Sequence, residues 1–384
     1  MSRLSAFFLF LFLVNLPGPG LAGQSAEKWS QPACLAAKAQ GWDIAYHHAA
    51  LHVVWALEEK IYWRMSLRDG EWTAPVVLAE GAVGFPDLVA GHDSLHLIWI
   101  KKLNIGYLAF DGAAWSPEED ALPNPVMVHG ARLAAAGDRP LVFFTRYEFG
   151  LVPHTPGSYP LFATAKKKHG WTAPRTIPSA SNVNNGLVSV IAVDETIHLA
   201  WVQEHRGFLF RNFGIGVGKR SKSLEYVSCD DSGAESGRPV RLGSLSKSIT
   251  RLGDLAISGA GDLAAVWIDG SSDAAGVSLR IKKAGPRGKW AAEGLLPGDA
   301  KRRPYHAAVI GARNGLILLT NAERREESRK IEATLVDGNG RESLSLSPFD
   351  WLLEAPRLAV SPEGEVHLLS YRYKYGLCYV RFSP

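Results

Sequence analysis

The sequence of 384 residues has little cysteine and little excess charge of either sign. Its 42 Lys and Arg residues against 38 Asp and Glu residues give a formal net charge of +4, spread along the chain, which does not favour nucleic acid as a partner. There is no Gly-rich phosphate loop, no Cys-x-x-Cys pair, no haem-attachment motif and no nucleophile elbow. The histidines lack the spacings that are specific for a metal site. We therefore expect no metal and no cofactor.

Long hydrophobic runs are also absent, apart from one near the N-terminus. Residues 1–23 carry Arg3, an apolar run over residues 6–16, a Pro-Gly break and the small residues Ala22 and Gly23. This order is typical of a cleaved secretory signal, and no Cys follows it that a lipid could modify. We expect export to the periplasm or the cell exterior, a single domain over residues 24–384, no membrane span in the mature chain, and a monomer.

What the sequence does contain is a repeat. A short β-strand pattern recurs seven times, most clearly as Leu-His-Val-Val-Trp in residues 51–55 and Leu-His-Leu-Ile-Trp in residues 95–99. Successive copies start at Leu51, Leu95, Pro140, Ile197, Leu263, Leu316 and Val366. This period predicts an all-β, seven-bladed β-propeller with one four-stranded blade per copy. The long interval between residues 197 and 263 leaves six blades as the alternative.

Each copy sits inside a longer unit. About nine residues upstream lies a small-residue strand, as in residues 87–90 and 357–360, separated from the repeat by a hairpin turn. A third strand follows, such as residues 61–64, and then a turn with a Trp and, in three units, a Pro that favours an outer edge strand. We predict the order inner, core, third and outer strand within each blade.

The two chain ends complement each other in this scheme. The last unit stops after its third strand, at about residues 377–382, while residues 28–32 match the outer-strand pattern of residues 71–75. We predict that the N-terminal strand completes the last blade, so that no open edge remains. Cys34 and Cys378 then lie on neighbouring strands, which predicts a disulfide between them, with two buried free thiols as the alternative. Cys229 has no partner.

The segment Ser66-Leu-Arg-Asp69-Gly70-Glu-Trp72 and the weaker Asp111-Gly-Ala-Ala-Trp115 resemble a degenerate Asp-box. By this resemblance the chain is similar to the sialidase-like, BNR-repeat propellers, in which such turns are structural. True sialidases of that superfamily use an Arg-Ile-Pro motif and a Tyr and Glu pair. The Arg-Ile-Pro motif is absent here, and the Tyr and Glu pair cannot be placed. The resemblance therefore implies the fold more strongly than the activity.

Chemistry is expected at the central channel. The first polar positions of the inner strands form a predicted ring of Asp43, Asp87, Arg132, Ser189, Asp254, His306 and Arg357. Such a ring either fills the channel with salt bridges and water or forms an acid–base and ligand-binding site. Our candidate catalytic residues are His306, Tyr371, Asp87 and Asp254.

Arginines and tyrosines of the ring and of the loops after the core strands are the candidate ligand-binding residues, because a guanidinium pairs bidentately with carboxylate or sulfate and a Tyr can stack on a sugar. They are Arg132, Arg146, Arg206, Arg251, Arg357, Arg372, Tyr147 and Tyr373. By contrast, His52, His96, His198 and His367 share one position of the core strand, so we interpret them as a structural repeat.

Two functions remain open. The first is an exported, non-catalytic recognition propeller that binds a glycan or a partner protein. The second is a glycosidase or polysaccharide lyase acting on an anionic sugar, with Arg132, Arg251 or Arg357 holding a carboxylate and His306 or Tyr371 transferring protons. Several arginines meeting in one pocket beside a Tyr and Glu pair favour the enzyme. A channel filled by Asp–Arg pairs favours recognition.

Overall fold

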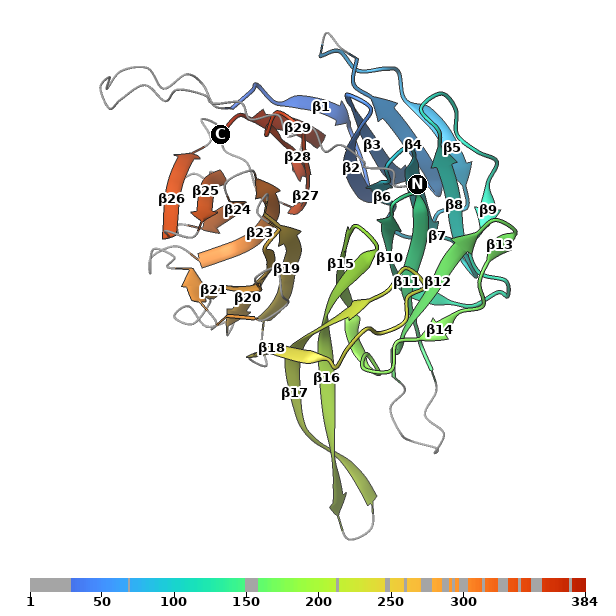
Figure 1. The fold of residues 1–384 in the computed structure, drawn as a ribbon, viewed down its shortest axis with the longest axis vertical. Coiled ribbons are helices and arrows are strands. Elements are labelled where there is room, and N and C mark those ends of the chain that lie inside the picture. Colours follow the sequence, from blue (N-terminus) through green and yellow to red (C-terminus); the bar gives the residue numbers. More distant parts are fainter. Residues whose placement is uncertain are drawn as a thin grey trace, which may run out of the picture.

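The computed structural model describes residues 29–67, 70–148, 158–211, 214–245, 249–258, 261–270, 278–284, 290–291, 294–296, 303–312, 315–323, 331–337, 340–346, 354–372 and 375–384. The described chain is all β-structure, and its strands form seven antiparallel sheets arranged as blades around a central axis (Figure 1). No helix in these ranges is long and apolar enough to cross a membrane. The predicted seven-bladed propeller is confirmed.

Blades 1 to 4 follow one another along the chain, each from the axis outward. Blade 1 contains β2 (Gly41–His47), β3 (Ala50–Leu57), β4 (Lys60–Met65) and β5 (Val76–Glu80). Blade 2 contains β6 (Asp87–Ala90), β7 (Leu95–Ile100), β8 (Ile105–Phe110) and β9 (Glu119–Asp120). Blade 3 contains β10 (Val128–Ala136), β11 (Arg139–Arg146), β12 (Leu161–Lys167), β13 (Gly170–Trp171) and β14 (Arg175–Thr176). Blade 4 contains β15 (Val183–Val193), β16 (Thr196–Arg211), β17 (Gly214–Cys229) and β18 (Val240–Leu245).

Blades 5 to 7 continue the same order. Blade 5 contains β19 (Ile249–Ile257), β20 (Leu263–Gly270), β21 (Ser278–Ala284) and β22 (Gly294–Leu296). Blade 6 contains β23 (Arg303–Ala312), β24 (Gly315–Glu323), β25 (Ile331–Asp337) and β26 (Gly340–Leu346). Blade 7 contains β27 (Glu354–Val360), β28 (Val366–Arg372), β29 (Gly376–Phe382) and, from the other end of the chain, β1 (Ala33–Ala36).

The closure of the ring follows the predicted pairing. Strand β1 runs antiparallel to β29, with Cys34 opposite Cys378, and their sulfur atoms are bonded (Figure 1). Trp29 forms a further bridge with Phe382, so the N-terminal segment extends the contact to the last strand residues. The predicted closure is confirmed. Residues 1–28, which include the predicted signal, lie outside the described residues.

The Trp residues lie slightly differently from the prediction. Trp72 bridges Ser66 across the turn, and the hydrogen-bonded outer strand β5 begins only after Pro75. In the same way β1 begins directly after Pro32. Proline has no N–H to donate to a ladder, so it marks the residue before the outer strand begins. Trp72 is therefore a turn residue in front of the outer strand, whereas Trp171 of blade 3 lies in the short strand β13.

The long interval between the fourth and fifth repeats comes from one hairpin. Strands β16 and β17 have 16 residues each and remain paired as far as Arg211 opposite Gly214. Figure 1 shows this hairpin projecting well beyond the ring. The extra residues thus lengthen two strands of blade 4 and do not replace a blade, which excludes the six-bladed alternative.

The core is divided among the blade interfaces. Each of seven clusters of buried apolar side chains joins two neighbouring blades, and the seventh joins blade 7 back to blade 1. Trp99, Trp201 and Trp267, from the repeated core-strand position, are among the largest fully buried side chains. Each buried side chain of this size contributes roughly 1.5–3 kcal/mol. The ring is therefore stabilised between its blades, which fixes the inner strands around the axis.

The repeated histidines support these interfaces, as interpreted from the sequence. His96, His198 and His367 hydrogen-bond to Tyr hydroxyls of the third strand in their own blade, and His52 accepts from the Trp63 indole. Those third-strand rings pack edge-to-face on a Trp of the next blade in four pairs, Trp63–Trp115, Tyr107–Trp171, Tyr226–Trp290 and Tyr379–Trp72. The histidine thus orients the aromatic ring that contacts the following blade.

Candidate functional site

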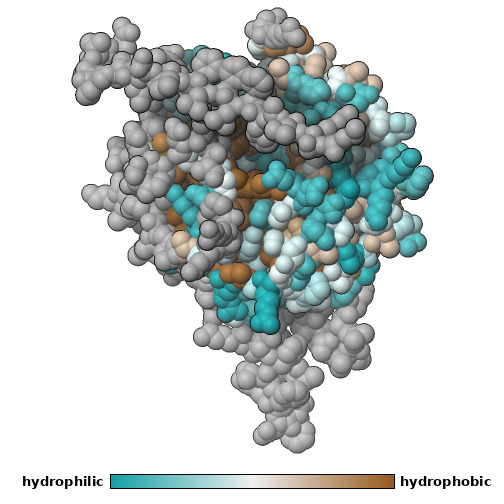
Figure 2. All heavy atoms as spheres, in the orientation of Figure 1, coloured by the Kyte–Doolittle hydropathy of each residue, from teal (hydrophilic) through white to brown (hydrophobic). Residues whose placement is uncertain are grey.

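A cavity of about 500 Å³ lies where the inner strands of all seven blades meet. Its walls are built from β2, β6, β10, β15, β19, β23 and β27, and most of its lining residues are aliphatic. Figure 2 shows hydrophobic side chains near the centre of the visible face and hydrophilic ones farther out over blades 1 to 3. The polar groups in the cavity are therefore few, and their placement decides what it can bind.

Most of the predicted polar ring lines this cavity. Six of the predicted ring residues each pair with the fourth residue of the core repeat. Asp43, for example, pairs with Val54, and Arg357 pairs with Leu369. The ring residues that line the cavity are Asp43, Asp87, Arg132, Ser189, Asp254 and Arg357. Because strand position fixes the direction of a side chain, one repeat position delivers these six groups to the axis.

His306, the ring residue predicted for blade 6, was assigned wrongly. In blade 6 the residue opposite the fourth core position, Leu319, is Ala308, and His306 lies two residues earlier, opposite Asn321. A register shift between Pro304 and His306 precedes this position. His306 is therefore not equivalent to Asp43, and Ala308 contributes a methyl group of blade 6 to the ring.

At three blade junctions, a ring side chain accepts a hydrogen bond from the backbone of the next blade. The Asp43 carboxylate accepts a hydrogen bond from the Leu88 N–H at 2.7 Å, and Asp87 accepts one from the Leu133 N–H at 2.6 Å. The Ser189 hydroxyl likewise accepts from the Leu255 N–H at 3.0 Å. These acceptors satisfy N–H groups on the inner strand of the following blade. The sequence carries no signal for this role, since any backbone N–H can donate.

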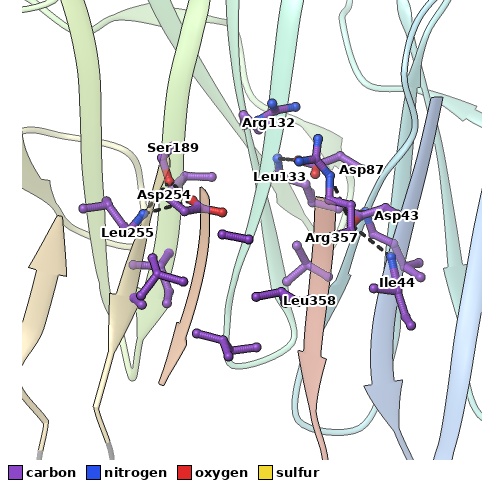
Figure 3. Close-up of a pocket in the computed structure, with 18 of the residues that line it drawn as sticks. Asp43, Ile44, Asp87, Arg132, Leu133, Ser189, Asp254, Leu255, Arg357 and Leu358 are labelled. Atoms are coloured by element: carbon purple, nitrogen blue, oxygen red, sulfur yellow. Dashed lines mark hydrogen bonds and ion pairs between the residues drawn. The ribbon is translucent and has the colours of Figure 1, made fainter. Parts of the chain in front are cut away.

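The two arginines of the ring lie on one side of the cavity. Figure 3 shows Arg132 and Arg357 near Asp43 and Asp87, with Asp254 and Ser189 on the opposite side. Arg357 Nε is 3.6 Å from Asp43 Oδ1, a loose ion pair. Arg132 donates to the carbonyls of Val188 and Ala131, and among the described residues it forms no ion pair. Both guanidinium groups retain capacity for an anion.

Burial changes the acidity of two ring carboxyls. Desolvation raises the pKa of Asp43 to about 7, the nearby Asp87 raises it further, and Arg357 opposes the change. Desolvation also raises the pKa of Asp254, against the hydrogen bond from Ser189 and the charge of Arg357. Asp43 therefore changes charge near neutral pH in contact with the Arg357 guanidinium.

Other predicted site residues lie away from the cavity. Tyr371 stacks on Trp42, with ring centroids 5.7 Å apart, at the interface of blades 7 and 1. Arg146 pairs with Glu148 at 2.9 Å and lies over the Phe162 ring, and the neighbouring Tyr147 packs near Tyr159. These packing contacts explain why they do not join the ring. Arg372 lies over the ring of Tyr375, also outside the cavity lining.

Some candidates are only partly placed. Arg206 and Arg251 lie in β16 and β19, and His306 lies in β23, but their side chains are outside the described part of the structure. Tyr373 and Asp69 lie outside the described residues altogether. In the second Asp-box-like turn, Asp111 accepts hydrogen bonds from the N–H groups of Ala113 and Ala114. That carboxylate therefore stabilises its own turn.

One exposed group outside the cavity brings possible metal ligands together. Among the described residues, only His92, Asp93 and Asp138 place three such atoms within 4.8 Å of one another. Asp138 accepts hydrogen bonds from the Asp93 and Ser94 N–H groups and from the Ser94 hydroxyl. This pattern joins the β6–β7 turn to the β10–β11 turn, which accounts for the cluster without an ion.

The comparisons with known proteins identify a fold. No family model and no curated protein matches the sequence. Among solved structures, polysaccharide lyase Uly1 is similar with a TM-score of 0.58 at 8% identity, over 90% of each chain. An ulvan lyase of polysaccharide lyase family PL25, bound to -[GlcA(1-4)Rha3S]-, has a TM-score of 0.53 at 11% identity over 88% of this chain and 90% of its own.

A hydrazine synthase of Kuenenia stuttgartiensis is equally similar in shape, with a TM-score of 0.58 at 10% identity over 90% of this chain and 96% of its own. One fold here accompanies unrelated chemistries, so the likeness by itself does not assign a reaction. What these structures and this chain have in common is the fold. The polar ring described above was found in this chain, around the axis of its propeller.

Proposed function

We propose that this chain is an exported glycan-recognition propeller that binds an acidic polysaccharide at its central cavity. The observation that carries the proposal is the pair Arg132 and Arg357, which face one cavity from blades 3 and 7 and are not saturated by the described carboxylates. A guanidinium fork matches carboxylate and sulfate oxygens. The two uronate- and polysaccharide-related propellers support this ligand class by analogy of fold.

Recognition is favoured over catalysis by the cavity lining. The described lining residues include no Tyr, no Glu and no His, and the three aspartates among them, Asp43, Asp87 and Asp254, each accept a hydrogen bond from the protein. Asp43 also uses both carboxylate oxygens as acceptors, from the Ile44 and Leu88 N–H groups. A carboxylate whose two oxygens both accept backbone hydrogen bonds serves mainly to stabilise the fold.

A polysaccharide lyase is the second candidate, and one observation favours it. The pKa of Asp43, raised to about 7 by burial, suits a group that exchanges protons at neutral pH. In this case Arg357 would neutralise a uronate carboxylate while Asp43 receives the proton from the adjacent carbon. The C–H electrons would form the new C=C bond as the glycosidic C–O bond breaks, and the leaving oxygen would take a proton from water.

Calorimetric titration of the full chain with a -[GlcA(1-4)Rha3S]- oligosaccharide, an oligogalacturonate and a neutral gluco-oligosaccharide tests the proposal. We expect binding of an acidic probe, and about tenfold weaker binding for Arg132→Gln and for Arg357→Gln. Arg146→Gln is the matched control, since Arg146 already pairs with Glu148 outside the cavity. Equal affinity for the neutral probe, or an equal loss in Arg146→Gln, contradicts the proposal.

The same mixtures separate binding from turnover. Ultraviolet absorbance of an unsaturated product and the appearance of new reducing ends are followed over time. Recognition predicts that neither changes. Product formation that disappears in Asp43→Asn would establish the lyase instead.

A further inference from the structure

An exposed aromatic ring lies beside the cavity, and the proposed function has not used it. Phe85 is 62% exposed, which is unusual for an aromatic side chain of this size. It belongs to the connection between outer strand β5 of blade 1 and inner strand β6 of blade 2. Two residues later comes Asp87, a member of the polar ring. Phe85 therefore lies at the end of the cavity where the inner strands begin.

The ring of Phe85 rests on a glycine. Gly41 is the first residue of β2, and a Cβ placed on it would come within 2.0 Å of Phe85 Cδ1. Gly41 and Asp43 are two residues apart on the same strand, so they share a face and lie about 6.6 Å apart. That face is also the one from which Asp43 reaches the Leu88 N–H of blade 2. Phe85 thus contacts β2 two residues before Asp43, which pairs with Arg357.

The backbone on either side of Phe85 is anchored even though the ring is exposed. Ala82 donates to the Glu59 carbonyl of blade 1 at 2.9 Å, and Val83 donates to the Ile100 carbonyl of blade 2 at 2.9 Å. Gly84 packs so closely on Ile100 that a Cβ there would approach it to 2.8 Å. Pro86 then restricts the chain on the other side of Phe85. Because this backbone is already fixed, a ligand that binds to the Phe85 ring loses little affinity to the entropy of ordering it.

Exposed apolar residues continue from Phe85 over the neighbouring connections. Val83 is 58% exposed, Leu103 is 47% exposed and Met127 is 70% exposed. The segments that carry them are joined by hydrogen bonds, from Val83 N–H to Ile100 and from Val126 N–H to Leu103. Phe85 is the aromatic member of these exposed residues, and it is the one whose ring contacts Gly41.

We propose that Phe85, seated on Gly41 at the mouth of the cavity, is a stacking platform for one pyranose ring of the bound polysaccharide, next to Arg357. This inference rests on the proposed function and adds a subsite to it. A pyranose has an apolar face of C–H groups that an aromatic ring covers, and carboxylates in its plane reach a cation at the side. The ligand class is therefore a uronate-containing polysaccharide, with its acid group toward Arg357 and its ring face on Phe85.

Titration of the full chain with the -[GlcA(1-4)Rha3S]- oligosaccharide and an oligogalacturonate tests the platform. We expect about tenfold weaker binding for Phe85→Ala, because the loss of one aromatic contact costs an affinity of this order. Phe85→Tyr should retain the affinity. Val83→Ala is the matched control from the same connection and should leave binding within about twofold. An unchanged affinity in Phe85→Ala, or an equal loss in Val83→Ala, overturns the inference.

Gly41→Ala gives an independent second variant. Its added Cβ must displace the Phe85 ring, while the glycine has no positive φ that an alanine would strain. We expect Gly41→Ala to weaken binding about as much as Phe85→Ala, and the double variant to weaken it no further. Additive losses would mean that Gly41 acts elsewhere and would count against the platform.

The outcomes separate this inference from the proposed function. Binding that Arg357→Gln weakens and Phe85→Ala leaves unchanged retains the proposed function and overturns the platform. Binding of a neutral gluco-oligosaccharide that Phe85→Ala weakens and Arg357→Gln does not retains the platform and overturns the acidic ligand. The absence of binding to every probe overturns both. Thermal denaturation of each variant checks that the fold is intact.

Discussion

His96 Nδ1 and the Tyr107 hydroxyl share a buried hydrogen bond of 2.9 Å between the core and third strands of blade 2. The Tyr107 ring then meets Trp171 of blade 3 edge-to-face, with centroids 5.0 Å apart. One polar contact inside a blade thereby fixes the ring that packs on the next blade. The same arrangement recurs from His198 and from His367, so local hydrogen bonds are coupled to the assembly of the whole ring.

Tyr107→Phe should lower the free energy of unfolding by about 1–2 kcal/mol, because it leaves a buried His96 nitrogen without its partner. Chemical denaturation measures the change. Tyr375→Phe is the matched control, since Tyr375 is 59% exposed and should change stability by no more than about 0.5 kcal/mol. An equal effect in both variants would contradict a role for the hydrogen bond.

Stability should fall as the pH is lowered from about 6.5 to about 4. Burial lowers the pKa of His52, His96 and His367 to about 4, whereas an unfolded histidine titrates near 6.5. In this window the unfolded chain binds more protons than the folded chain, so acid favours unfolding. Denaturation midpoints measured from pH 4 to pH 8 check this, and a midpoint that rises toward pH 4 would exclude it.

Asp43 acts in the opposite direction over much of the same range. Its pKa is raised to about 7 in the folded chain, so its contribution is present at low pH and is lost as the pH rises toward 7. Burial also raises the pKa of Asp254, which acts in the same direction as Asp43, but the three histidines outweigh the two carboxyls and the net slope stays positive. Asp43→Asn should therefore steepen the rise of stability from pH 4 to pH 6.5, which separates the two effects.

The closure disulfide should account for a large part of the stability. Cys34 and Cys378 are 344 residues apart in sequence, and a crosslink over so long a loop restricts the unfolded chain by about 6 kcal/mol in the chain-entropy description. Cys34→Ser and Cys378→Ser should each lower the melting temperature and remove the sensitivity to reductant. Non-reducing mass analysis should find two bonded cysteines in the parent chain.

Cys229→Ser serves as the matched variant for this test. Cys229 is buried and free, and burial raises the pKa of its thiol to about 12, so it is a poor nucleophile for exchange. Its replacement should leave the response to reductant intact. A parent chain with three free thiols, all reactive after denaturation, would show that closure proceeds without the crosslink.

Binding of a uronate oligosaccharide should strengthen as the pH falls toward about 7. Ionised Asp43 competes with the ligand carboxylate for Arg357, and protonation of Asp43 removes this competitor while the arginine stays charged. Above about pH 7 the affinity should fall by up to about tenfold per pH unit. In Asp43→Asn the affinity should be independent of pH between 6 and 8. A pH dependence that persists in this variant would point to another group.

The sequence was sufficient for the architecture because each blade repeats the same local code. The core repeat, the hairpin turns and the complementary ends together predicted seven blades and the pairing of Cys34 with Cys378. The polar ring could also be placed, since six of its members stand at one position relative to the core strand. His306 failed because the ring position of blade 6 is occupied by Ala308, so a search for a polar residue selected the histidine two residues earlier.

The loop residues were harder to predict, for a physical reason. Arg146, Tyr371 and Arg372 lie at the ends of the core strands β11 and β28, where a converging site would require them, yet each is packed against a neighbouring ring or carboxylate. The position of a residue in the sequence gives the end of the propeller on which it lies. Contacts with neighbouring residues then decide in which direction its side chain points. The position of Phe85 could not be predicted from the sequence, because an exposed apolar residue in a connection belongs to no periodic pattern. Its ring packs where Gly41 has no Cβ, and this contact is visible only in the structure.

The pairing of β1 with β29 also sets an order of events during folding. Blade 7 draws strands from residues 33–36 and 376–382, so the first of these segments must wait for the last to be made. Until then β1 has no partner, and the seventh interface, between Trp42 and Leu369, cannot form. A contact of such long range is slow to form, and open strand edges invite aggregation in the meantime. The chain therefore stays exposed to aggregation until the last step of folding, which closes the ring.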